Sequence, residues 1–100
     1  MRKNFRTYQI SVKFYQLCRK GTFPNHLRNQ LDRAASSIVL NLAEGAGRES
    51  TKEQKRFFTI AFGSLRESQA ILDLAPDHSE AIECADCLAA HLYRLIQKVR

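Results

Sequence analysis

Residues 30–48 read QLDRAASSIVLNLAEGAGR, and this stretch decides the fold. Its apolar side chains recur at spacings of three and four, which places them on one face of an α-helix. They are Leu31, Ala34, Ala35, Ile38 and Leu42, with Leu27 extending the same face upstream. We expect the helix to have Asn25 as its N-cap after Pro24 and to run to Glu44. Gly45 and Gly47 are expected to stop it, because glycine adopts the left-handed C-cap conformation without steric cost.

Downstream of this stretch, Ser50-Thr51-Lys52-Glu53 matches a capping box and predicts the start of another helix, which extends to about Ala75. Its inward face is predicted to consist of Phe57, Phe58, Ala61, Leu65, Ser68, Leu72 and Ala75. Its outer face is predicted to carry Lys52, Lys55, Thr59 and Arg66. Gly63 lies in the middle, where glycine costs about 1 kcal/mol relative to alanine. We interpret Gly63 as a point where two helices approach closely.

Upstream, residues 5–20 predict a helix with two apolar stripes, ended by Gly21. One stripe contains Ile10, Phe14, Leu17 and Cys18, and the nearly opposite one contains Phe5, Tyr8, Val12 and Tyr15. An amphipathic helix at the surface of a bundle needs only one such stripe. The second stripe therefore suggests that the protein associates with itself.

The C-terminal part predicts a fourth helix after the break at residues 76–79, which read PDHS. Its apolar face contains Ile82, Ala85, Leu88, Ala89, Leu92, Leu95, Ile96 and Val99. Four helices with short connections have antiparallel neighbours. The predicted fold is therefore all-α, an antiparallel up-down-up-down four-helix bundle that forms a single domain over residues 1–100.

Composition narrows the class of protein further. The chain of 100 residues is 44% hydrophobic and 26% charged, which is typical of a globular domain and not of a disordered one. No apolar run approaches the roughly 20 residues that span a bilayer, and the basic N-terminus leads into no signal segment. We therefore expect a cytoplasmic protein without membrane contact, whose three cysteines are reduced thiols.

A polar stripe borders the apolar face of the second helix. It consists of Gln30, Arg33, Ser37, Asn41 and Glu44, and Ser64 and Glu67 occupy the corresponding edge of the third helix. Polar groups at the edge of a core need hydrogen-bond partners, or each costs about 1–3 kcal/mol. One interpretation is a hydrogen-bonded network that fixes the helix register. The other is that the stripe lines a subunit interface or a binding groove.

The charge of +6 is unevenly distributed along the chain. Residues 1–66 contain 13 basic and four acidic residues, a net charge of +9, whereas residues 67–100 have a net charge of −3. Such a separated positive field favours a polyanionic partner, with nucleic acid first. Because no aromatic array interleaves the basic residues, contact with phosphates is expected rather than base readout. The candidate contacts are Arg2, Lys3, Arg6, Lys13, Arg19, Lys20, Arg28, Arg48, Lys52, Lys55, Arg56 and Arg66.

The stretch at residues 30–48, followed by FFTIAFGSLRE at residues 57–67, resembles the four-helix-bundle family named after 23S rRNA intervening-sequence proteins. The family pattern is R-A-x-x-S-I-x-x-N-I-A-E-G-x-G-R, followed by a helix that carries G-S-L-x-E. Matching positions hold Arg33, Ala34, Ser37, Ile38, Asn41, Ala43, Glu44, Gly45, Gly47, Arg48, Gly63, Ser64, Leu65 and Glu67. Leu42 replaces the commoner isoleucine, and Asp32 lies where a basic or apolar residue is usual, which reduces the local positive charge.

The resemblance implies a homopentamer around a central channel and no enzymatic activity. Some members are encoded within insertions of large-subunit rRNA genes, and relatives in diversity-generating retroelements bind nucleic acid and a reverse transcriptase. The predicted function is thus that of a non-catalytic, homo-oligomeric basic protein that binds nucleic acid, with RNA as the first candidate. The alternative is an oligomeric scaffold that docks a partner protein such as a reverse transcriptase. No cofactor is expected.

Two further segments contain residue types that could bind a metal ion or a phosphate. Cys84, Cys87 and His91 share a helix face, but a structural zinc site needs a fourth ligand, which His26 or His78 would have to supply from a loop. Small thiols at the edge of a core explain these cysteines better, so no metal site is predicted. The AEGAGR segment lacks the Lys-Ser/Thr signature of a phosphate-binding loop, and its glycines fit a helix C-cap.

Overall fold

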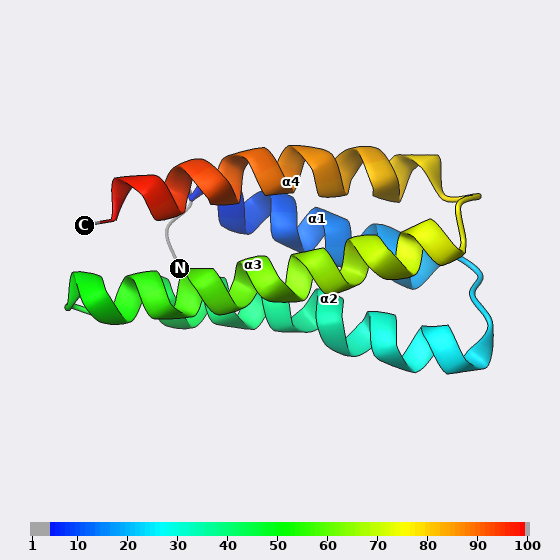
Figure 1. Cartoon of the computed structure of the whole chain (residues 1–100), viewed down its shortest axis with the longest axis horizontal. Coiled ribbons are helices and arrows are strands. Elements are labelled where there is room, and N and C mark those ends of the chain that lie inside the picture. Colours follow the sequence, from blue (N-terminus) through cyan, green and yellow to red (C-terminus); the bar gives the residue numbers. More distant parts are fainter. Residues whose placement is uncertain (1–4, 100) are drawn as a thin grey trace.

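The computed structural model describes residues 5–99, which form four α-helices and no strand. The helices are α1 (Arg6–Lys20), α2 (Asn25–Ala46), α3 (Thr51–Leu74) and α4 (Ser79–Lys98). They run along the long axis of a body that measures 40 × 21 × 20 Å. The α1–α2 and α3–α4 connections lie at one end and the α2–α3 connection at the other, so consecutive helices run in opposite directions (Figure 1). This arrangement is the predicted four-helix bundle.

Each helix packs against two neighbours. α1 contacts α2 and α4, α3 contacts α2 and α4, and the most extensive contact joins α2 to α3. The apolar faces predicted from the sequence spacing meet in one core, although Phe57 is half-buried and lies outside it. The fully buried side chains of this core include Phe14, Leu31, Ile38, Leu42, Leu65, Leu72, Leu88 and Leu92. Hydrophobic periodicity alone therefore predicts which faces turn inward.

The second apolar stripe of α1 packs largely within its own chain. Phe5, Tyr8 and Tyr15 are half-buried and lie against the core, because α1 is flanked by two helices rather than one. Thr7 and Ser11, which separate the stripes, are themselves buried. The two stripes thus belong to one broad buried face, and they do not by themselves require a second copy of the chain.

Two predictions about the ends of α2 are wrong. The helix begins at Asn25 and its N-cap is Pro24, with no capping side chain, because the Pro24 carbonyl accepts from the backbone N–H groups of Leu27 and Arg28. At the other end, Gly45 is a buried helical residue and Gly47 caps the helix in the right-handed conformation. No residue in the range 5–99 has a positive φ, so neither glycine is needed for a left-handed cap.

The glycines instead differ in the space around them. A Cβ at Gly45 would lie 2.6 Å from the ring of Phe58, so Gly45 permits the close contact between α2 and α3. At Gly63 a Cβ would meet nothing within 4 Å, and the residue is exposed. The expected close approach of two helices at Gly63 is therefore wrong within this chain. It occurs at Gly45.

The capping box at the start of α3 is present in half of its expected form. Ser50 is the N-cap, and its hydroxyl accepts from the backbone N–H of Glu53 at 3.1 Å. The Glu53 carboxylate accepts from Arg56 at 3.3 Å. The serine satisfies one of the backbone donors that have no partner within the helix, which explains why α3 begins at Thr51.

Candidate functional site

Two members of the polar stripe, Ser37 and Asn41, form a network with Ser64 of α3. The hydroxyl oxygens of Ser37 and Ser64 lie 2.8 Å apart and share a hydrogen bond. The amide nitrogen of Asn41 donates to the Ser37 carbonyl at 2.8 Å and to the Ser37 hydroxyl at 3.0 Å. Ser68 then donates to the Ser64 carbonyl at 2.9 Å, one turn further along α3. The network joins the two helices in the register that the core requires.

The remaining residues of the polar stripe and Glu67 of α3 do not join this network. Gln30, Arg33 and Glu67 are exposed, and Glu44 forms an ion pair with Arg48 at 2.5 Å. Ser68, which is fully buried, was expected in the core but not in the network. Its position four residues after Ser64 was the available signal, because residues at this spacing share a helix face.

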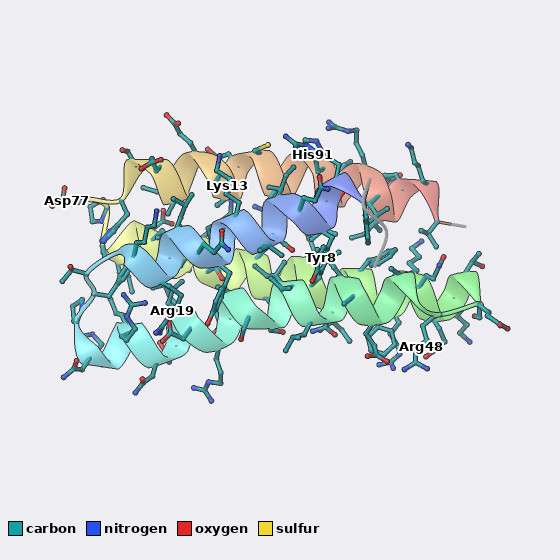
Figure 2. All side chains as sticks on the ribbon, turned by 180° about the vertical axis from the view of Figure 1, so that it is seen from behind. Tyr8, Lys13, Arg19, Arg48, Asp77 and His91 are labelled. Atoms are coloured by element: carbon teal, nitrogen blue, oxygen red, sulfur yellow. The ribbon has the colours of Figure 1, made fainter. Side chains whose placement is uncertain are left out.

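Two of the candidate contact arginines serve the packing of α1 on α2. Asp32 accepts from Arg19 at 2.7 Å and from Arg28 at 2.9 Å. Arg28 also donates to the backbone carbonyls of Cys18, at 3.0 Å, and Gly21, where α1 ends. Figure 2 shows Arg19 on the side where α1 faces α2. Asp32 therefore neutralises part of the positive charge on this side, as its place in the sequence suggested.

Two further arginines flank an aromatic ring near the α2–α3 connection. The guanidinium carbons of Arg48 and Arg56 lie 5.0 and 4.5 Å from the centroid of the Phe57 ring. Each also has an acidic partner, Glu44 for Arg48 and Glu53 for Arg56. Arg48 lies near the end of the bundle opposite to Asp77 (Figure 2). These arginines are held by the protein itself and carry a locally balanced charge.

The outer face of α3 holds cations without such compensation. Lys52 and Lys55 are exposed, and among residues 5–99 no carboxylate lies within 4 Å of either ammonium group. Arg66 donates to the neutral amide of Gln69 at 2.8 Å and lies over the Phe62 ring at 4.7 Å, so it is oriented without losing its charge. We call Lys52, Lys55 and Arg66 the α3 cation set.

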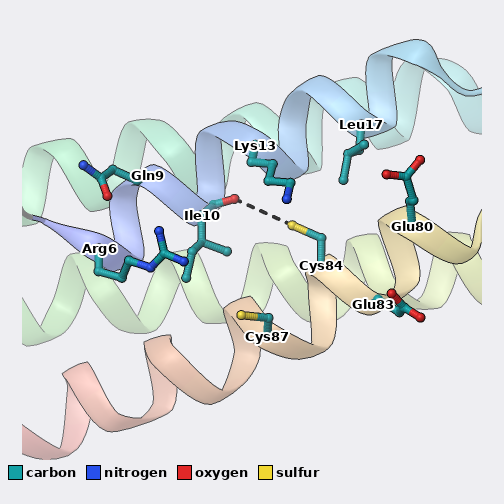
Figure 3. A pocket seen from close by; sticks show the side chains of 9 residues that line it. All are labelled: Arg6, Gln9, Ile10, Lys13, Leu17, Glu80, Glu83, Cys84 and Cys87. Carbon is teal, nitrogen blue, oxygen red and sulfur yellow. Dashed lines mark hydrogen bonds between the residues drawn. The ribbon is translucent and has the colours of Figure 1, made fainter.

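A second group of cations lies on α1. Within the described part of the chain Arg6, Lys13 and Lys20 form no ion pair, although acidic residues lie nearby. Arg6 and Lys13 line a cavity of about 330 Å³ between α1 and α4, and Glu80 and Glu83 line it from the other side (Figure 3). The two carboxylates partly offset the positive charge of Arg6 and Lys13, and they repel an anion that would bind in this cavity. Arg2 and Lys3 lie outside the described residues.

The two cysteines of α4 differ in exposure, because Cys84 is half-buried and Cys87 is exposed. Cys84 lines the same cavity, where its thiol donates to the Ile10 carbonyl at 3.9 Å (Figure 3). Burial raises the pKa of the Cys84 thiol, and nearby Lys13 opposes this shift. Cys87 is exposed, with its sulfur 3.8 Å from Nδ1 of His91. Within residues 5–99, no three potential ligands are grouped in a way that would hold a metal ion.

Fold and charge together define the class: a small basic four-helix bundle with a set of exposed cations on the outer face of α3 that have no carboxylate partner among residues 5–99. The family model of the 23S rRNA-intervening sequence protein matches residues 3–98 of the chain. The chain therefore belongs to this family. A comparison with curated proteins gave no match. In the described part of the chain, no helix is both long and apolar enough to cross a membrane.

Proposed function

We propose that this protein is a non-catalytic, homo-oligomeric nucleic-acid-binding protein of the cytoplasm, with RNA as its first ligand. The observation that carries the proposal is the α3 cation set, because no ion pair among residues 5–99 neutralises its charges. By contrast, Arg19, Arg28, Arg48 and Arg56 all pair with carboxylates. The family description, which refers to an intervening sequence of 23S rRNA, supports RNA as the ligand.

The expected binding mode is contact with the phosphate backbone. Phe57 and Phe62 are each approached by an arginine, so they do not offer free faces on which bases could stack. Cations without aromatic platforms bind phosphates and carry little sequence information. Binding should therefore be weakly selective for sequence and should fall steeply as salt is added.

The test is the salt dependence of binding to an RNA hairpin, a DNA duplex and heparin. Each phosphate neutralised on duplex DNA contributes about −0.9 to the slope of log affinity against log salt. The variant Lys52→Glu, Lys55→Glu, Arg66→Glu should weaken binding to all three ligands and flatten the slope by about 2 to 3 per protomer engaged. Helical content should stay unchanged, since all three side chains are exposed.

The matched control reverses the three unpaired cations of α1, in the variant Arg6→Glu, Lys13→Glu, Lys20→Glu. It changes the net charge of the chain by the same amount, so a general electrostatic effect would weaken both variants equally. We expect the α3 variant to bind less well than the α1 variant at every salt concentration. Equal loss in both variants would contradict α3 as the contact surface.

A scaffold that docks a partner protein, such as a reverse transcriptase, is the second candidate function. Exposed apolar side chains favour it, because Leu40 on α2 and Ile60 on α3 are 65% and 41% exposed. Exposed apolar side chains on a protein surface can mark a contact with another protein. If the wild-type protein shows no salt-sensitive binding to any of the three polyanions, this second function takes precedence.

A further inference from the structure

Two thiols of α4 lie three residues apart and line the same cavity between α1 and α4. Cys84 and Cys87 both border this space of about 330 Å³. The radius and rise of an α-helix place Cα atoms three residues apart at a distance of about 5 Å. This distance lies within the range of about 4.4–6.8 Å that a disulfide spans. The backbone of α4 therefore holds the two cysteines at a separation that a disulfide can bridge.

The two thiols differ in how a reagent can reach them. Cys84 is half-buried and donates to the Ile10 carbonyl at 3.9 Å, and burial raises the pKa of its thiol. Cys87 is exposed, and Nδ1 of His91 lies 3.8 Å from its sulfur and 2.9 Å from its carbonyl oxygen. Because a carbonyl oxygen only accepts hydrogen bonds, this Nδ1 carries a proton. A reagent in solution therefore meets the Cys87 sulfur first, with an N–H donor beside it.

Charges of both signs line the walls of this cavity. Arg6 and Lys13 come from α1, and Glu80 and Glu83 come from α4. Lys13 points from α1 towards Cys84, whose thiol it influences electrostatically (Figure 3). A molecule with charge of one sign is repelled by one of these walls, whereas a molecule with an ammonium and a carboxylate group matches both. The volume is at the lower end of the roughly 300–1,000 Å³ of ligand pockets, which suits a ligand of amino-acid size.

We propose that Cys87 and Cys84 form a dithiol site that is oxidised by a small zwitterionic disulfide such as cystine. The Cys87 thiolate attacks one sulfur of the reagent R–S–S–R and forms Cys87–S–S–R, and the R–S⁻ that leaves takes up the proton that Cys87 lost. The Cys84 sulfur then leaves the Ile10 carbonyl and attacks the Cys87 sulfur. The bond to R–S breaks, and this second leaving group takes up the Cys84 proton. Two protein thiols become one disulfide, and the reagent disulfide becomes two thiols.

The first test treats the full-length wild-type protein with cystine, traps the remaining thiols with iodoacetamide and maps the products by mass spectrometry. The expected product is a chain with a Cys84–Cys87 disulfide and a free Cys18, because Cys18 is only 1% exposed. A mixed disulfide that persists on Cys87 of the wild type would overturn the dithiol site. A disulfide that includes Cys18 would overturn it as well.

Serine variants test the order of the two steps. Cys84→Ser keeps a hydroxyl that can donate to the Ile10 carbonyl, and its reaction should stop at the mixed disulfide on Cys87. Cys87→Ser removes the exposed thiol, so its remaining cysteines should be lost about tenfold more slowly than the wild-type pair or slower still. If Cys87→Ser reacts as fast as the wild type, Cys87 is not the attacking thiol and the proposal is wrong.

A comparison of three reagents tests the charge of the ligand. Cystine is zwitterionic, cystamine is cationic and dithiodipropionate is anionic. Each rate is divided by the rate of the same reagent with the chain unfolded in urea, which cancels the intrinsic reactivity of the reagent. This ratio should be about fivefold higher for cystine than for the other two. Equal ratios would overturn the zwitterionic ligand.

Variants of the two walls should change this preference in opposite directions. Arg6→Gln with Lys13→Gln leaves the carboxylates of α4 in place and should raise the ratio for cystamine. Glu80→Gln with Glu83→Gln leaves the cations of α1 in place and should raise the ratio for dithiodipropionate. Variants that leave all three ratios unchanged would contradict a role of these walls. No step involves nucleic acid, so the outcome is independent of the proposed function.

Discussion

At the scale of single residues, Cys18 shows what the core does to a titratable group. Its side chain is 1% exposed, and burial, with a smaller contribution from Cys84, raises the pKa of its thiol to about 12 against the opposing effect of Arg28. The thiolate is the reactive form of cysteine. Cys18 is therefore an inert packing residue, whereas Cys87 is exposed.

This shift predicts how stability depends on alkaline pH. In the unfolded chain the thiol ionises from a pKa near 9.0, but in the folded chain it keeps its proton until about pH 12. The unfolded state is therefore favoured as the pH rises above 9, by up to about 1.4 kcal/mol per unit. Between pH 9 and 10, urea unfolding should show the wild type losing about 1 kcal/mol more than Cys18→Ala. Equal losses would mean that the thiol is accessible in the folded protein.

The two helical glycines, Gly45 and Gly63, predict opposite effects of the same substitution. Alanine gains the same helix propensity at both positions, about 1 kcal/mol. At Gly45, however, the added Cβ would be forced against the buried ring of Phe58, whereas at Gly63 it meets nothing. Gly63→Ala should raise the free energy of unfolding, and Gly45→Ala should be less stable than Gly63→Ala by about 1–3 kcal/mol. Thermal melts followed by circular dichroism measure this difference, and equal stabilities would contradict the close contact at Gly45.

At the scale of elements, the four helices could be predicted because their apolar residues follow the helical period over many turns. Their ends were less predictable. Asn25 and Gly45 have the right residue types for caps, but packing of α2 on α3 extends the helix to Ala46. Pairing between helices was not visible in the sequence either, because Arg19 meets Asp32 only once α1 lies on α2. In the candidate site, spacing identified Ser37, Asn41 and Ser64, whereas the unpaired state of Lys52 and Lys55 depends on every neighbouring carboxylate.

The start of α3 offers a prediction for one element. Ser50 satisfies a backbone donor of the first turn, and α2 has no equivalent capping side chain at its own start. Ser50→Ala should lower the free energy of unfolding by about 1 kcal/mol. Ser36→Ala is the matched control, since its hydroxyl only donates to the Arg33 carbonyl within the same helix. A loss at Ser50 no larger than that at Ser36 would show that the cap does not stabilise α3.

At the scale of the whole molecule, the fold determines which of the basic residues have acidic neighbours, and the sequence alone shows only that most of the basic residues lie in residues 1–66. Glu80 and Glu83 of α4 lie beside the cations of α1. Asp32 forms ion pairs with Arg19 and Arg28, which lie between α1 and α2. The outer face of α3 is left with Lys52, Lys55 and the oriented Arg66. The positive excess of residues 1–66 thus includes three cations on the outer face of α3 that have neither an ion pair nor an acidic cavity wall beside them among residues 5–99. In a cyclic assembly this surface would be repeated once per copy, which multiplies the field acting on a polyanion.

Assembly is the last prediction, and it concerns the apolar surface that a single chain leaves open. Leu40 and Ile60 are exposed on the two helices that contact each other most, and nothing in the described chain covers Gly63. A closed ring uses two different surfaces of each copy, so a charge placed in one of them should break every interface. Light scattering of the wild type at micromolar concentration should give a molecular mass that is a multiple of 11.5 kDa, with five copies expected.

The double variant Leu40→Glu, Ile60→Glu should have a lower molecular mass in the same measurement, while its helical content remains that of the wild type. Leu74→Glu, at an equally exposed leucine near the end of α3, is the matched control and should assemble as the wild type does. A wild-type protein that stays at 11.5 kDa would refute self-assembly, whereas an oligomer insensitive to the double variant would place its interface elsewhere on the bundle.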